Sequence, residues 1–171
     1  PQNESLSRLL SQEDYVFSGL RVEVKSNKGS RNLLFKKGEE VELFVKLNKA
    51  GYFYAVGHTK KPGEDYSYLM PLGNGEGQKK FIYFVNDATV NKWISLGKFE
   101  VTPPFGLESI QIISSEKEPA KIPDYIFDKN TELYMIANNA EEGIVRTRAL
   151  KPKPSADNGS AEAVLVFTTS Q

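Results

Sequence analysis

The chain has 171 residues, of which 39% are hydrophobic and 26% charged, and its 22 basic residues balance 22 acidic ones. This is the composition of a globular chain, and a formal charge of zero provides no long-range field to attract nucleic acid or an anionic membrane. The absence of cysteine excludes disulfides, thiolate metal sites and cysteine nucleophiles. No apolar run approaches the roughly 18 residues of a membrane span.

The first 14 residues are predicted to form an N-terminal arm. Leu6, Leu9 and Leu10 recur at helical spacing, and Ser5 is a suitable helix cap. This pattern predicts a helix of one or two turns at most, or an extended arm that packs lightly on the domain. From residue 15 the hydrophobic period changes to two, which predicts a single β-sandwich domain over residues 15–171.

The first strands of this domain are predicted from alternating patterns. Residues 20–24 alternate apolar and charged side chains, and residues 41–47 do the same with one apolar face, as in a half-buried strand. Residues 52–58 are bulky on both faces, as expected of a central strand. The short link at residues 48–51 predicts that these last two strands form a hairpin.

The rest of the chain continues as short apolar runs between turns. The last two runs are predicted to pair as a C-terminal hairpin across the loop at 151–160. Roughly nine or ten turn-separated strands favour an all-β, antiparallel sandwich with immunoglobulin-like layering, with a partly open barrel as the other possibility. The further strands are predicted at residues 66–72, 81–85, 93–102 (as two flanks, 93–96 and 98–102, on either side of Gly97), 110–114, 132–137, 143–150 and 163–169.

A Pro-Pro-Phe-Gly segment at residues 103–106 cannot continue a strand ladder, because neither proline has an N–H to donate. We expect it to form a fixed corner between two strands, with Phe105 anchored in the core.

Three segments carry a resemblance to a known family. They are LFKKGEEVELFVKLNKAGYFYAVG at 34–57, YLMPLGNG at 68–75 and FEVTPPFGLESIQIISS at 99–115. Their order resembles the bacterial domain-of-unknown-function family 4384, which typically shows a Gly-Tyr-aromatic strand, a Leu-Phe-Pro-like turn and a Pro-Pro-Gly-type corner. Leu69-Met70-Pro71 stands where Leu-Phe-Pro is usual. The resemblance spans 34 to about 115 and implies an accessory module of cell-envelope and signalling proteins, without catalytic residues.

The residues that could support catalysis or metal binding lack partners in the sequence pattern. His58 is the only histidine, and we interpret it as a strand-end side chain satisfied by backbone or solvent. The acidic pairs fall at turns, where carboxylates are usually solvated. The loop at residues 73–80 has three glycines but no following helix and no phosphate-loop lysine. We therefore predict no catalytic residue, no cofactor and no metal site.

Aromatic residues crowd the middle of the chain, and most of them are expected in the core. Tyr66, Tyr68 and Trp93 border polar or glycine-rich loops and are the candidates for a ligand or partner surface, although burial is favoured for Trp93. We predict a non-catalytic interaction module with a protein or envelope-component partner, in the periplasm or outside the cell. The alternative is a carbohydrate-binding module that uses these rings as an exposed platform. The oligomeric state is left open.

Overall fold

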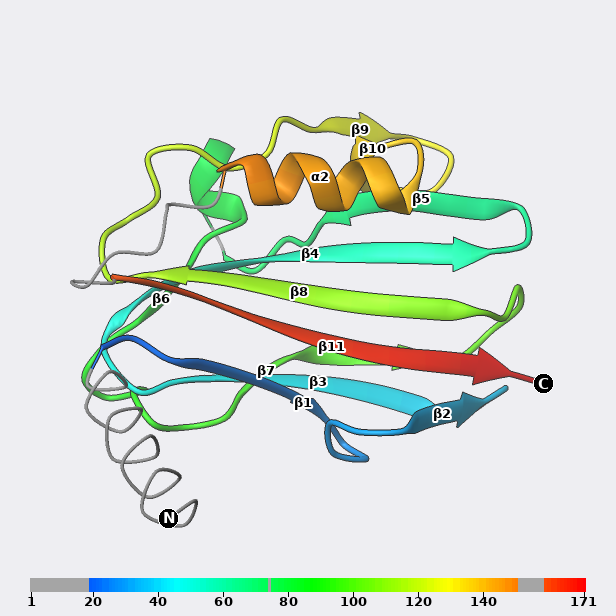
Figure 1. Ribbon diagram of the computed structural model, residues 1–171, viewed down its shortest axis with the longest axis horizontal. Coiled ribbons are helices and arrows are strands. Elements are labelled where there is room, and N and C mark those ends of the chain that lie inside the picture. The colour runs from blue at the N-terminus through cyan, green and yellow to red at the C-terminus, as the bar shows by residue number, and fades with distance from the viewer. Residues whose placement is uncertain (1–18, 74, 151–158) are drawn as a thin grey trace, which may run out of the picture.

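The computed structural model describes residues 19–73, 75–150 and 159–171 (Figure 1). The predicted arm at residues 1–14 lies outside this part of the chain. The described residues are mostly strand, with one α-helix, as the alternating patterns predicted. The elements are β1 (Val22–Ser26), β2 (Leu33–Lys36), β3 (Glu40–Leu47), β4 (Gly51–Lys61), β5 (Glu64–Leu69), η1 (Gly77–Lys80), β6 (Tyr83–Val85), β7 (Ile94–Glu100), β8 (Leu107–Ser115), β9 (Ile126–Asp128), β10 (Leu133–Ala137), α2 (Ala140–Leu150) and β11 (Ser160–Ser170).

The strands form two sheets. One sheet has three strands in the order β1-β3-β7, and the other has eight, in the order β2-β11-β8-β4-β5-β10-β9 with β6 also paired to β4. All pairs are antiparallel except β11 with β2. Figure 1 shows the three-stranded sheet below the long strands β8 and β11, and α2 above β4.

The large sheet has an apolar core on each face. On one face, buried residues of the small sheet such as Leu43 and Val45 pack with Phe53 and Ile112 of the large sheet. The alternation predicted for residues 41–47 is confirmed, since Val41, Leu43, Val45 and Leu47 are at most 2% exposed. A second cluster on the other face is built around Val56 and Ile113. The two clusters explain why β4 is bulky on both sides and central, as predicted.

The predicted hairpin at residues 48–51 is wrong. β3 lies in the small sheet, between β1 and β7, whereas β4 lies in the large sheet, between β8 and β5. The link therefore carries the chain from one sheet to the other. Asn48 fixes the link, because its side chain accepts a hydrogen bond from the Arg21 N–H (2.5 Å) and donates one to the Gly19 carbonyl (2.9 Å). A strand with one apolar face can lie in an outer layer, but β4 needs cover on both faces.

The strand predicted at residues 143–150 is also wrong, because this segment belongs to the helix α2. Asn139 caps the helix by accepting a hydrogen bond from the Glu142 N–H at 2.7 Å. Glu142 and Arg146 form an i,i+4 ion pair along it. The predicted C-terminal hairpin therefore does not exist: β11 pairs with β8 and with β2 instead.

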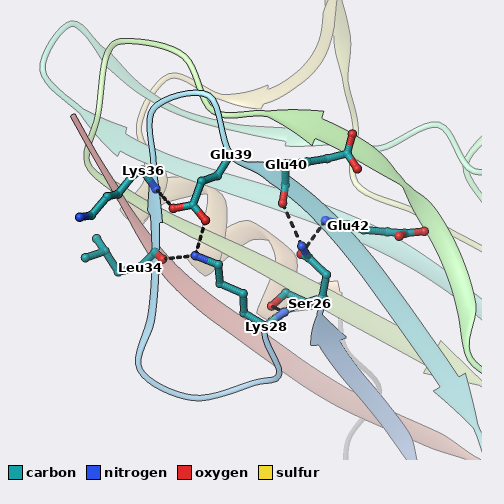
Figure 2. A network of polar contacts seen from close by, with 8 residues as sticks. Ser26, Lys28, Leu34, Lys36, Glu39, Glu40 and Glu42 are labelled. Carbon is teal, nitrogen blue, oxygen red and sulfur yellow. Dashed lines mark hydrogen bonds and ion pairs between the residues drawn. The ribbon is translucent and has the colours of Figure 1, made fainter.

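A polar network fastens the segment that passes from β1 through β2 to β3 (Figure 2). The Asn27 side chain donates to the Glu40 carbonyl and accepts from the Glu42 N–H, both at 3.0 Å. Lys28 forms an ion pair with Glu39 at 2.6 Å and donates to the Leu34 carbonyl at 3.0 Å. This network holds the chain where it leaves the small sheet at β1 and joins the edge of the large sheet at β2, a strand that was not predicted.

The Pro103-Pro104-Phe105-Gly106 segment forms the predicted corner between β7 and β8, on opposite sheets. Phe105 is partly buried and packs against the main core. The Gly106 N–H donates to the Thr169 hydroxyl at 3.0 Å, and the Thr169 N–H donates to the Gly106 carbonyl at 2.8 Å. The corner is thereby fastened to the end of β11.

Candidate functional site

The prediction that backbone or solvent satisfies His58 is wrong. A buried network of side chains forms the hydrogen bonds of its ring instead. Its Nδ1 lies 2.6 Å from the Ser67 hydroxyl, and its Nε2 lies 2.9 Å from Oε1 of Gln111. Because an amide oxygen only accepts, Nε2 carries the proton and Nδ1 accepts from Ser67. Gln111 in turn donates to Glu162 at 2.7 Å.

The His58 network has the residue types of a nucleophile and a base, but it is closed to substrate. Ser67 is 0% exposed, and α2 covers it so closely that a Cβ on Gly143 would lie 1.8 Å from the Ser67 oxygen. Burial also lowers the pKa of His58, against a smaller opposing contribution from the hydrogen bond to Gln111. The arrangement thus holds a neutral histidine that joins four strands under the helix.

Trp93 is exposed, which corrects the prediction that favoured a place in the core. It is 37% exposed and immediately precedes β7 of the small sheet. The ammonium groups of Lys25 and Lys46 lie 4.2 and 4.6 Å from its ring centroid. Lys25, Phe44 and Lys46 occupy positions of β1 and β3 that alternate with the buried ones, so Trp93 lies with them on the outer face of the small sheet. Favourable cation–π contacts with both lysines help to hold the ring there.

Tyr66 and Tyr68 lie on one face of β5, with their ring centroids 6.1 Å apart. Ser67 between them points to the opposite face, under α2. Burial and the nearby Glu64 carboxylate raise the pKa of Tyr66 to about 12. The structure brings these two tyrosines together but leaves Trp93 apart from them, on the other sheet. The three predicted residues therefore do not form one platform.

A cavity of about 140 Å³ lies where β3 and β7 face β5 and β8, next to the Pro-Pro corner. Lys61 and Glu108 form part of the cavity wall, and their side chains are joined by an ion pair of 2.8 Å. These side chains are only 13% and 14% exposed. Glu108 also accepts a hydrogen bond from the Thr59 hydroxyl at 3.0 Å. The remaining lining is mostly apolar: Val41, Leu43, Tyr68, Met70, Phe99, Glu100, Val101, Thr102, Ile110, Phe167 and Thr169.

A wider groove of about 640 Å³ runs beside β9, the last strand of the large sheet. Ile126 and Phe127 of β9 are 78% and 46% exposed. Sequence reasoning missed this strand, although the apolar run at 125–127 after a proline was a usable signal. The groove also takes in Tyr66, and the other residues that line it are Asp65, Asp128, Met135, Ile136, Ala137, Asn138 and Arg146.

Within the described part of the chain, no three His, Cys, Asp or Glu side chains gather in a way that could hold a metal ion. Among those same residues, no helix is both long and apolar enough to cross a membrane.

Comparison with known proteins gave no relative. No protein-family model, no curated protein and no solved structure matches this chain. The resemblance of residues 34–115 to family 4384 therefore stays a prediction from its motifs.

Proposed function

We propose that this chain is a non-catalytic protein-interaction module with a β-sandwich architecture, and that it binds an extended segment of a partner protein along β9. The observation that carries this proposal is the exposed apolar edge at Ile126 and Phe127 beside the groove. Exposed apolar side chains on an edge strand favour the addition of a strand from another chain. The resemblance to family 4384 supports the same class of function, in a bacterial envelope or signalling protein.

The free edge of β9 supports this mode of binding. Among the described strands β9 pairs only with β10, through the residues from Ile126 to Asp128. Its other edge can therefore offer backbone N–H and C=O groups to an incoming strand. Such hydrogen bonds give affinity without sequence preference, while contacts with the exposed side chains of β9 give specificity.

The charges that line the groove indicate the chemistry of the partner. Asp65 and Asp128 contribute carboxylates, and hydrogen bonds from Thr131 and from the Asn130 N–H lower the pKa of Asp128. Arg146, the one cation among the described residues that line the groove, is already paired with Glu142. The groove thus presents negative charge beside apolar side chains. An apolar extended segment that contains a lysine or arginine would complement it.

A selection from a library of random peptides would test the proposal. We expect enriched peptides to be apolar with a basic residue, and to shift the amide resonances of β9 and β10 when added to labelled protein. Ile126→Asp should abolish binding. The matched control is Val166→Asp, an equally drastic change at a 49% exposed position of β11, near the other edge of the same sheet. Peptides that bind Ile126→Asp as well as the wild type would refute the proposal.

The carbohydrate alternative has one observation in its favour, the exposure of Trp93. Its ring is contacted by the Lys25 and Lys46 ammonium groups, so a stacked sugar would have to share or displace them. A glycan array separates the two functions: a specific hit that is lost in folded Trp93→Ala would support carbohydrate binding at this surface.

A further inference from the structure

We propose that the cavity next to the Pro-Pro corner binds a small, neutral, mainly apolar molecule that carries one hydroxyl or carbonyl oxygen. This site is separate from the β9 groove, and the inference does not depend on the function proposed above. It rests on the size of the cavity, on a hydroxyl at its wall to which no described residue forms a hydrogen bond, and on the balance of charge around it.

The size of the cavity limits the ligand to about the volume of a single aromatic ring. Its volume is about 140 Å³, and an apolar cavity of about 150 Å³ is known to stay dry and to bind benzene. Leu43 and Ile110 provide buried apolar walls, at 1% and 2% exposed. Phe99 and Thr102 also line the cavity but are exposed, so its mouth opens at the surface beside the corner.

Tyr68 supplies the polar contact. No described residue forms a hydrogen bond with its hydroxyl, while every fully buried side-chain nitrogen or oxygen in the same part of the chain has a partner. The hydroxyl must therefore reach open space, and the cavity is the space that Tyr68 lines. Gly57 makes room for this position, since a Cβ there would come within 2.2 Å of the Tyr68 ring.

The charges favour a neutral ligand over an ion. Lys61 is neutralised by Glu108 at 2.8 Å, so the ammonium group is not free to attract an anion. The third charged residue of the lining, Glu100, is exposed to solvent. Burial, followed by the charge of Glu108, raises the pKa of Tyr68, which keeps the hydroxyl protonated and able to donate. An uncharged oxygen acceptor on an apolar body satisfies this donor without adding a charge to a poorly solvated site.

Phenol and toluene are suitable probes, because they have nearly the same shape and differ in one hydroxyl. We expect both to shift the methyl resonances of Leu43, Met70 and Ile110 in the folded 171-residue protein, with phenol binding more tightly. Tyr68→Phe keeps the ring and removes only the oxygen. It should weaken phenol binding about threefold to tenfold, the range expected for one hydrogen bond, and leave toluene binding unchanged.

A second variant tests the location. Val101→Phe adds bulk to the cavity wall and should block both probes, with circular dichroism as the check of folding. If this variant does not fold, phenol and toluene binding by Tyr68→Phe and by the wild type still tests the proposal. Absence of shifts at the lining methyl groups would overturn the proposal. Equal weakening of phenol and toluene by Tyr68→Phe would overturn the assigned role of the hydroxyl.

Discussion

At the scale of single residues, His58 shows how a polar side chain is accommodated beneath the helix. It is 5% exposed, and both ring nitrogens have a partner, Ser67 on one side and Gln111 on the other. Burial and the nearby Arg148 charge both disfavour the protonated ring, so its pKa is lowered from 6.5. A buried polar group that is fully paired adds specificity to the packing, but it is costly to disturb.

The lowered pKa of His58 predicts a loss of stability on acidification. The unfolded chain takes up the proton first as the pH falls below 6.5, the ordinary pKa of this side chain. Stability is therefore full above that value and declines as the pH drops toward the folded pKa of His58. Chemical denaturation between about pH 8 and pH 5 should show the decline in the wild type, and His58→Gln should remove most of it within that window.

The carboxylates provide an internal check on this measurement. Hydrogen bonds lower the pKa values of Glu39 and Asp128 from 4.5 and 3.8. These carboxyl groups therefore change stability only at pH values below the range in which His58 does. A decline between about pH 8 and pH 5 that is the same in His58→Gln and wild type would show that His58 is not its source.

At the scale of elements, the contact between α2 and β5 depends on Gly143. A Cβ at this position would lie 1.8 Å from Oγ and 2.2 Å from Cβ of Ser67. The helix also starts on β5, because the Ala140 N–H donates to Asp65 at 2.8 Å. Glycine is unfavourable inside a helix, so its presence here is explained by close approach rather than by propensity.

Gly143→Ala should destabilise the protein by about 1–3 kcal/mol, the usual cost of overpacking, although the same change in an open helix is stabilising. Thermal or chemical denaturation measures the effect. Val145→Ala is the matched control on the same helix, at a 68% exposed position, and should change stability by less than about 0.5 kcal/mol. Gly143→Ala should cost less in a Ser67→Gly background than in the wild type, because the contested space is then free. A neutral Gly143→Ala variant would contradict this packing.

β3 illustrates the contribution of one apolar face to the main core. Leu43 is 1% exposed and also lines the cavity. Leu43→Ala should cost about 2–5 kcal/mol through lost burial and an enlarged cavity. Val166→Ala, at a 49% exposed position, should cost less than about 0.5 kcal/mol in the same denaturation experiment. Similar small effects for the two variants would mean that the face of β3 is not buried.

At the scale of the whole molecule, β4 and β8 form the centre of the structure. They pair with each other over nine residues, and the large sheet in which they lie carries a core on both faces. The strands β2 and β9 are short and lie at the two ends of that sheet. Local opening is easiest where few buried contacts must be broken.

Amide hydrogen exchange should follow this arrangement. The amides of Ala55, Val56 and Ile112 are expected to exchange only through global unfolding, with free energies equal to that of the whole domain. The amides of β9 should exchange faster through local opening. Uniform protection from β9 to β4 would contradict this difference and would also argue against a β9 edge that is free to receive a partner strand.

The sequence by itself determined the predominance of strand, the half-buried face of β3, the central position of β4 and the corner at residues 103–106. These features depend on local alternation and on the missing N–H groups of proline, so each can be read within a short window. Tertiary structure decided the sheet to which each strand belongs, as the wrong hairpin at 48–51 shows. It also decided that residues Ala140–Leu150 form a helix. Asn139 and the acidic first turn were the local signals of this helix, whereas the close contact of Gly143 with Ser67 arises only when α2 packs on β5. The exposure of Trp93 and the cavity beside Tyr68 likewise arise from segments far apart in the chain, since burial depends on which strands meet and not on a residue's own neighbours in sequence.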